Sequence, residues 1–200
     1  MTAGRGVTHT ERTPMFRRTT KEFVMHGYQI WVALPMRMEE IDPQFSFYSR
    51  TDIPQWHTDS LPLKLVAGNA FGKSAPLQGY SPLFIVDIFA EKATTLKLKR
   101  QINGEVAFVI VKGSIIDEDQ KVVAEQMLIS KTNDECEICI EENTQLLLFG
   151  GEALPQEHFL PWNFVSHDKK RLKKAKRELA EKKFPKVPGD GSYIPIPDYL

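Results

Sequence analysis

The chain has 200 residues, of which 42% are hydrophobic, and its 26 basic and 26 acidic side chains give a net charge of zero. This length allows one large or two small domains with buried cores, because domains typically hold about 100–150 residues. The balanced charge argues against bulk electrostatic capture of nucleic acid or of an anionic membrane. No apolar run approaches the ~20 residues that a membrane-spanning helix needs, so a membrane protein is not expected either.

Cysteine usage points to a reducing compartment. Cys136 and Cys139 are the only two cysteines, too few for a disulfide framework. We therefore expect a cytoplasmic protein, or a nuclear one if the source is eukaryotic. Their C-E-I-C spacing also suggests a zinc or redox site, but no second cysteine pair follows. The pair lies in a β-type run among glutamates, which disfavour thiolate formation, so a structural role is favoured.

Short β-type runs separated by turn residues dominate the sequence and predict an all-β fold. Residues 28–34 (YQIWVAL) alternate between two faces and end at Pro35. Gln29 and Trp31 share one of these faces and either line a pocket or, as we favour, pack in a core. Further runs follow about every ten residues, most of them separated by Gly, Asn or Pro: 63–67, 83–89, 94–99, 106–111, 121–129, 136–140 and 144–149. This spacing is typical of a sandwich, barrel or jelly roll.

One helix is predicted near the C-terminal end, with Ser166 as N-cap, Asp168 in the first turn and Pro185 closing the segment. Leu172, Ala175 and Leu179 form a narrow apolar stripe, and most of the other face is basic. That face is either the solvated side of a docked helix, which we favour, or a contact for nucleic acid or another anionic surface. The proline-rich residues 184–200 predict an extended tail.

His9 and Glu11 form an H-x-E pair near the N-terminal end of the sequence. If residues 8–12 are a strand, both side chains point to the same face and could share one metal ion. Taken alone, such a pair is more often a surface ion pair or a hydrogen-bonded strand end. His26, which precedes Gly27, is interpreted as a turn histidine that bonds to the backbone, with a metal ligand as the alternative.

Several separate segments, in the same order, resemble the pirin family. They are MTAGRGVTHTE, HGYQIWVALP, LVAGNAFG, SPLFIVDI, LLLFGGEAL, PWNFVS and FPKVPGDGSYIPIP. Pirins are double cupins, with two jelly-roll β-barrels in one chain. The resemblance implies an all-β double cupin with an incomplete N-terminal barrel (1–50), a linker (51–60), a C-terminal cupin (61–161), and a helix with a proline-rich tail (162–200).

In pirins, the N-terminal barrel binds one iron through three histidines and one glutamate. The resemblance places His9 and Glu11 in this ligand set, with Glu11 also the candidate catalytic base. The other two histidines come from an H-P-H-R-G motif that this sequence lacks, and its remaining histidines, at 26, 57, 158 and 167, lie in unrelated contexts. Met1 aligns with an internal methionine of pirins. We therefore expect a chain that begins late in the family pattern and holds iron weakly or not at all.

The resemblance implies two classes of function that use the same iron. One is a quercetin 2,3-dioxygenase-type oxidoreductase with a flavonol-like substrate, of which this chain would be weakly active or inactive. The other is a metal-dependent regulator that binds a transcription factor or an enzyme without catalysis. Removing strands from a barrel exposes backbone edges and apolar side chains, so we also expect self-association through residues 1–50.

Overall fold

The computed structural model describes residues 1–19, 24–59, 61–130 and 137–197. The chain divides into two compact units, which we call the terminal unit (Met1–Phe45 with Gln156–Leu200) and the barrel unit (Ser46–Pro155). The terminal unit holds helices α1 (Met15–Arg18) and α2 (Lys169–Ala180) and the short 3-10 helix η1 (Met36–Met38). In the part of the chain that is described, no helix combines the length and apolar character needed to cross a bilayer.

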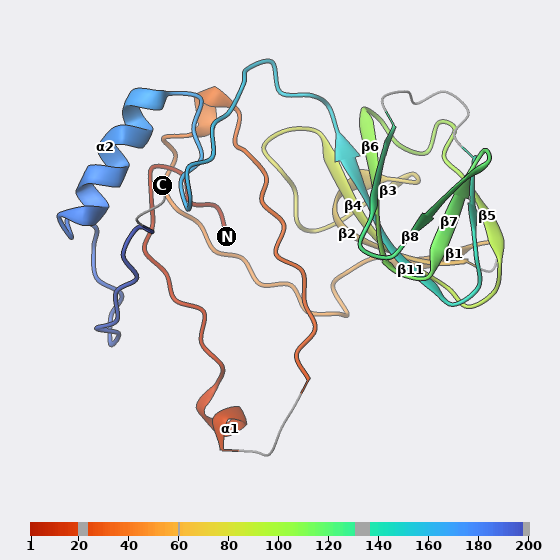
Figure 1. Cartoon of the computed structure of the whole chain (residues 1–200), viewed down its shortest axis with the longest axis horizontal. Helices are drawn as coiled ribbons and strands as arrows, with labels where there is room; N and C mark the ends of the chain where they lie inside the picture. Colours follow the sequence, from red (N-terminus) through yellow and green to blue (C-terminus); the bar gives the residue numbers. More distant parts are fainter. Residues whose placement is uncertain (20–23, 60, 131–136, 198–200) are drawn as a thin grey trace. The chain divides into compact units, whose positions relative to one another are not determined.

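Two antiparallel sheets form the barrel unit (Figure 1). One sheet has the strand order β1-β2-β4-β11-β6-β9, with β3 beside β2, and the other has the order β5-β10-β7-β8. The strands are β1 (Gln55–Thr58), β2 (Leu61–Ala70), β3 (Lys73–Ser74), β4 (Leu83–Ala90), β5 (Thr94–Lys97), β6 (Glu105–Lys112), β7 (Ser114–Asp117), β8 (Gln120–Val123), β9 (Met127–Ser130), β10 (Glu137–Ile140) and β11 (Thr144–Gly151). The predicted all-β fold of the jelly-roll type is confirmed.

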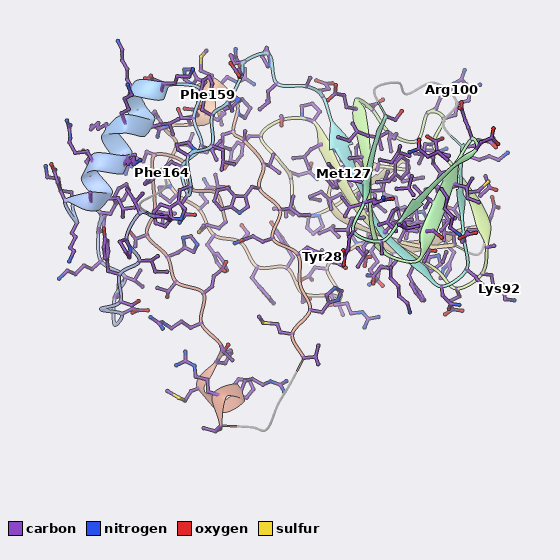
Figure 2. The ribbon with its side chains drawn as sticks, in the orientation of Figure 1. Tyr28, Lys92, Arg100, Met127, Phe159 and Phe164 are labelled. Atoms are coloured by element: carbon purple, nitrogen blue, oxygen red, sulfur yellow. The ribbon has the colours of Figure 1, made fainter. Side chains whose placement is uncertain are left out.

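The core of the barrel unit follows from strand alternation, which sends every second side chain inward. The register pairs Leu63 with Ile88, Val86 with Leu148, and Leu148 with Phe108, and all of these side chains are fully buried. Figure 2 shows side chains filling the space between the two sheets. The predicted runs 63–67, 83–89, 106–111 and 144–149 therefore lie in the strands that supply this core.

Two strand boundaries within the barrel unit differ from the predictions. The predicted run 121–129 is two strands, β8 and β9, separated by a turn in which Glu125 adopts a φ of +69°. Within residues 51–60, which were expected to be a linker, Gln55–Thr58 forms β1 and pairs with β2. Only one residue of β1, Trp56, is half-buried. This edge strand therefore lacks the alternation of apolar and polar residues from which strands are predicted.

The strand predicted at 28–34 is wrong, and residues 8–12, where a strand would have placed His9 and Glu11 on one face, are not a strand either. Neither stretch has regular secondary structure, and neither forms a ladder with any other described residue. Tyr28, Ile30, Trp31 and Val32 are exposed, at 39–54% of their full surface. A strand needs a neighbour to satisfy its backbone groups, and alternation alone does not supply one. The terminal unit instead contains two isolated bridges, Thr2 with Gln44 and Phe159 with Ser166.

Helix α2 begins two residues later than predicted. Asp168, not Ser166, is its N-cap, and its carboxylate accepts a hydrogen bond of 2.7 Å from the Lys170 amide. Of the predicted stripe, Leu172 is buried, while Ala175 and Leu179 are half-buried. The helix ends at Ala180 rather than next to Pro185, because Lys182 adopts a left-handed φ of +55° and stops it. Ser166 has another role, in the terminal unit's buried polar cluster.

Candidate functional site

His9 and Glu11 lie in an exposed, irregular stretch of the terminal unit. Among the described residues, Glu11 receives one side-chain hydrogen bond, a long one of 3.5 Å from Gln29 Nε2. This contact places Glu11 beside residues 28–34, the segment that carries the aromatic Gln-x-Trp sequence. No described residue makes a hydrogen bond to the His9 ring, so both proposed ligands remain accessible.

Arg12 anchors this stretch to the proline-rich tail. Its guanidinium donates to Asp190 Oδ2 at 2.5 Å and to Ser192 Oγ at 2.7 Å. Hydrogen bonds from the Ser192 hydroxyl and amide, together with that from Arg12, lower the pKa of Asp190 to about 2. The tail is therefore tied by charge-assisted bonds to the residue next to Glu11.

Residues 2–6 are anchored from the other side, by the segment that follows η1. Arg5 N donates to Ile41 O at 2.9 Å, and Thr2 and Gln44 exchange both backbone hydrogen bonds. Gly4 makes this approach feasible, because it has a φ of +51° and a Cβ on it would lie 2.1 Å from Ile41 O. The backbone leading to His9 is thus fixed to residues 41–44.

Glu39 is the centre of a buried polar cluster in the same unit. Its side chain is 4% exposed. Oε2 accepts from Ser166 Oγ at 2.5 Å and from Arg171 Nη1 at 3.1 Å, while Oε1 accepts from the His167 amide at 2.9 Å and lies 3.0 Å from His167 Nδ1. Arg171 also donates to Glu39 O and pairs with Glu40 at 2.8 Å. The carboxylate is saturated with donors from residues 166–171.

These donors determine the charge of Glu39. Burial acts to raise the pKa of Glu39, but the hydrogen bonds from Ser166 and from the His167 amide and ring outweigh it, so the pKa falls from 4.5 to about 2. The group is therefore ionised at any physiological pH. A buried, saturated carboxylate has no free lone pair for a substrate, and we interpret the cluster as the clasp that holds residues 36–41 to residues 158–171.

The Glu39 cluster was missed from the sequence. His158 and His167 were set aside as histidines in unrelated contexts, and Ser166 was interpreted only as a helix cap. Glu39 stands in an ordinary Glu-Glu pair, 127 residues from Ser166 and 132 from Arg171. No local spacing connects residues so far apart, and only an alignment of related sequences could have signalled the pairing.

A complete metal site is not present within the described residues. No group of three or more His, Cys, Asp or Glu side chains in residues 1–19, 24–59, 61–130 and 137–197 is arranged to hold a metal ion. His9 and Glu11 therefore have no third described ligand beside them. The pair contributes one imidazole nitrogen and one carboxylate, which suit iron but do not by themselves fit an octahedral site.

The described residues of the barrel unit provide no alternative set of metal ligands. Its described buried side chains are apolar except for Ser114 and Thr144. Thr144 Oγ1 accepts from Ser114 N and donates to Ser114 O, both at 3.1 Å, and the Ser114 hydroxyl donates to Glu141 Oε2, so both side chains have hydrogen-bond partners. Cys139 is an exposed free thiol on β10, and its partner in the C-E-I-C sequence, Cys136, lies outside the described residues.

Comparison with known proteins gives three findings. Residues 85–185, about half of the chain, match the Pirin C-terminal cupin domain. A "Pirin-like protein" of Caulobacter vibrioides is 34% identical over 99% of this chain and 68% of its own length. A Pseudomonas aeruginosa relative, provisionally named as a quercetin 2,3-dioxygenase, is 30% identical over 90% of this chain and 56% of its own length.

The solved structures agree. The crystal structure of a quercetin 2,3-dioxygenase from Acinetobacter baumannii matches 84% of this chain with a TM-score of 0.75 and 26% identity, over 56% of its own length. The chain thus spans between about half and two thirds of the length of these three proteins. The match to the C-terminal cupin domain covers half of the chain, and the Caulobacter relative aligns with almost all of it. The resemblance found in the sequence is confirmed, and the chain belongs to the pirin family.

Proposed function

We propose that His9 and Glu11 are two protein ligands of a non-haem iron, in a protein that acts on a flavonol as a quercetin 2,3-dioxygenase-type oxidoreductase. The observation that carries the proposal is the accessible pair itself, whose Glu11 is held by a single long hydrogen bond from Gln29. The relatives with dioxygenase names support the reaction class. Glu11 is also the candidate base for the flavonol hydroxyl, because a carboxylate within reach of an acidic proton can accept it.

The chain by itself should hold iron weakly. Two side chains leave most of an octahedral shell to water, and the described residues add no third ligand. Stable sites also need neighbours that orient each ligand, whereas His9 receives no hydrogen bond from a described residue. We therefore expect weak or no activity from these 200 residues alone.

Iron content tests the ligand assignment. We expect the purified chain to contain well under one iron per molecule by elemental analysis. Titration with Fe(II) under anaerobic conditions should reveal weak binding that His9→Ala and Glu11→Gln each reduce by at least tenfold, since removing one of two ligands removes half of the protein's contribution. His57→Ala, at an exposed residue of β1, is the matched control and should bind like the unmodified chain.

One outcome would contradict the ligand assignment, and two others would contradict the expectation of weak binding and weak activity. Weak binding that is unchanged in both His9→Ala and Glu11→Gln would mean that neither residue is a ligand. Stoichiometric iron that disappears in His9→Ala would mean that the site is complete and that our expectation of weak binding is wrong.

Flavonol consumption, followed by absorbance, should not exceed the rate given by free iron in buffer. Turnover that survives chelation and repurification but is absent in Glu11→Gln would also show a complete site.

A binding protein without catalysis is the second candidate, and an exposed apolar segment favours it. The segment is residues 24–32, in which five large apolar side chains are exposed in addition to Tyr28: Val24 at 96%, Met25 at 81%, Ile30 at 39%, Trp31 at 47% and Val32 at 54%. Contiguous apolar surfaces of this kind are rare on monomers and mark interaction sites. A second copy of the chain is the simplest partner, because irregular backbone at 28–34 can pair with the same backbone in another molecule.

Light scattering tests this association. We expect the chain to exceed its monomer mass of 22.9 kDa at high concentration. The double variant Ile30→Glu, Trp31→Glu should shift it toward monomer, and added salt should not weaken the association, since it is apolar. Val123→Glu, at a 42% exposed residue of the barrel unit, is the control. A monomer at high concentration, with strong amide protection throughout 24–34, would contradict the prediction.

We also infer a cytoplasmic location and no nucleic-acid partner. The exposed Cys139 thiol would persist in a reducing compartment. The basic face of α2 carries Lys170 and Lys173 in solvent, without interleaved aromatic side chains. We therefore keep the interpretation of this face as the solvated side of a docked helix.

A further inference from the structure

The stretch that carries His9 and Glu11 has few contacts of its own. Residues 8–12 have no regular secondary structure, and no backbone hydrogen bond from another described residue holds them. Among the described residues, only the long bond from Gln29 reaches the Glu11 side chain. Backbone without such bonds opens easily. The positions of the two candidate ligands therefore depend on what holds the ends of this stretch.

On its N-terminal side, the stretch packs against the C-terminal tail. A Cβ on Gly6 would lie 3.4 Å from Cε1 of Phe184, so the Phe184 ring lies against this glycine. Phe184 in turn stacks on Phe164, with 6.0 Å between the ring centroids. In Figure 1 the tail, drawn in dark blue, reaches the red N-terminal segment. Apolar packing thus fixes the chain just before residue 8.

On its C-terminal side, the stretch is held by a carboxylate that the tail itself orients. Arg12 Nε donates to Asp190 Oδ2 at 2.5 Å, and Arg12 Nη2 donates to Ser192 Oγ at 2.7 Å. Ser192 donates to Asp190 Oδ1 through its amide at 2.9 Å and through its hydroxyl at 2.7 Å. The Asp190 side chain is only 13% exposed. Such a forked, charge-assisted contact fixes the orientation of Arg12 as well as its distance.

The tail can act as a support because it is bonded to α2. Tyr193 Oη donates to Leu179 O at 3.1 Å, and Lys182 Nζ lies 4.9 Å from the centroid of the Tyr193 ring. The Asp190 amide donates to Val187 O at 3.1 Å, which closes a turn just before the carboxylate that Arg12 contacts. A displacement of Arg12 would therefore have to move a segment that is itself bonded to a helix.

We propose that Asp190 is a positioning residue for the two iron ligands. Acting through Arg12, it fixes the backbone of residues 8–12 and limits how far His9 and Glu11 move relative to each other. Ligands that are already in place bind more tightly, because less conformational freedom is lost on binding. The role toward iron rests on the proposed function, whereas the hold of the tail on residues 8–12 does not.

NMR relaxation of the metal-free, 200-residue chain tests the hold of the tail. We expect backbone order parameters of residues 8–12 to lie near the ~0.85 of rigid backbone, and to fall below ~0.6 in Arg12→Met and in Asp190→Asn. The matched control is Arg37→Met, which removes one positive charge at an exposed residue of η1. The hydrogen-bonded Ser166 amide should keep its protection from exchange in all three variants, because the rest of the terminal unit remains folded.

Anaerobic titration of the same variants with Fe(II) separates positioning from electrostatics. Arg12 follows Glu11 directly, so removing its positive charge should by itself strengthen the binding of a cation. Loss of positioning has the opposite sign. We therefore expect iron to bind at least fivefold more weakly to Arg12→Met than to Arg37→Met, and at least fivefold more weakly to Asp190→Asn than to the unmodified chain.

The proposal is overturned if residues 8–12 have low order parameters already in the unmodified chain, or keep high ones in Arg12→Met and Asp190→Asn. It is also overturned if Arg12→Met binds iron as tightly as Arg37→Met while His9→Ala still weakens binding. In that case His9 remains a ligand and only the role of Asp190 is lost. Iron binding that neither His9→Ala nor Glu11→Gln reduces would instead contradict the proposed function, and this inference with it.

Discussion

Replacing Glu39 with Gln should destabilise the terminal unit by about 3 kcal/mol at neutral pH. The pKa of Glu39 falls from 4.5 to about 2 on folding, and each pKa unit corresponds to about 1.4 kcal/mol. Because the folded pKa is lowered, this stability is fully present above about pH 4.5 and is lost as the pH falls from there toward 2. In Glu39→Gln, this stability and its loss in acid should disappear, while the smaller acid dependence due to Asp190 should remain.

The measurement is urea unfolding followed by tryptophan fluorescence in a Trp56→Phe background. The two remaining tryptophans, Trp31 and Trp162, both belong to the terminal unit. Glu40→Gln is the matched control, because its neighbouring carboxylate is 70% exposed and pairs with Arg171 on the surface. We expect this control to cost well under 1 kcal/mol, as exposed ion pairs usually do. If the free energy of unfolding falls in acid as much in Glu39→Gln as in the unmodified chain, Glu39 does not hold residues 36–41 to residues 158–171.

Replacing Gly4 with Ala should release residues 2–6 from residues 41–44. The left-handed backbone of Gly4 costs about 1–2 kcal/mol for any residue with a Cβ. The added carbon would also lie 2.1 Å from Ile41 O, so the backbone of one segment must move. We expect amide protection at Arg5 and Gln44 to fall at least tenfold, because both donate across this contact.

The matched control is Gly27→Ala, since nothing lies within 4 Å of a Cβ at Gly27 and its φ is not left-handed. This variant should leave the exchange of Arg5 and Gln44 unchanged. If His9 and Glu11 bind iron, Gly4→Ala should also weaken the residual iron affinity, although it alters neither ligand. Unchanged protection in Gly4→Ala would show that the segments separate in solution and that residues 41–44 do not position the H-x-E stretch.

The barrel unit could be predicted because its signal is local. Strand alternation marks strand structure locally, so the runs 63–67, 83–89 and 144–149 were predicted from their composition and spacing alone, and they contain the core residues Leu63, Val86 and Leu148. The same reasoning failed for residues 28–34, where the pattern is equally clear but no described neighbour pairs with the backbone. Alternation shows that a segment could be a strand, whereas hydrogen bonds from another segment decide whether it becomes one.

By itself, the sequence determined the family, the jelly-roll fold of the barrel unit and the candidate ligands His9 and Glu11. Only the tertiary structure revealed Glu39 and its donors, which lie 127–132 residues away. It also decided that Asp168 caps α2 while Ser166 bonds to Glu39, and that Arg12 bonds to Asp190. The physical reason is that the charge and the partners of a polar side chain depend on burial and on contacts with residues far away in the sequence. Such contacts produce no repeating pattern of residues from which they could be predicted.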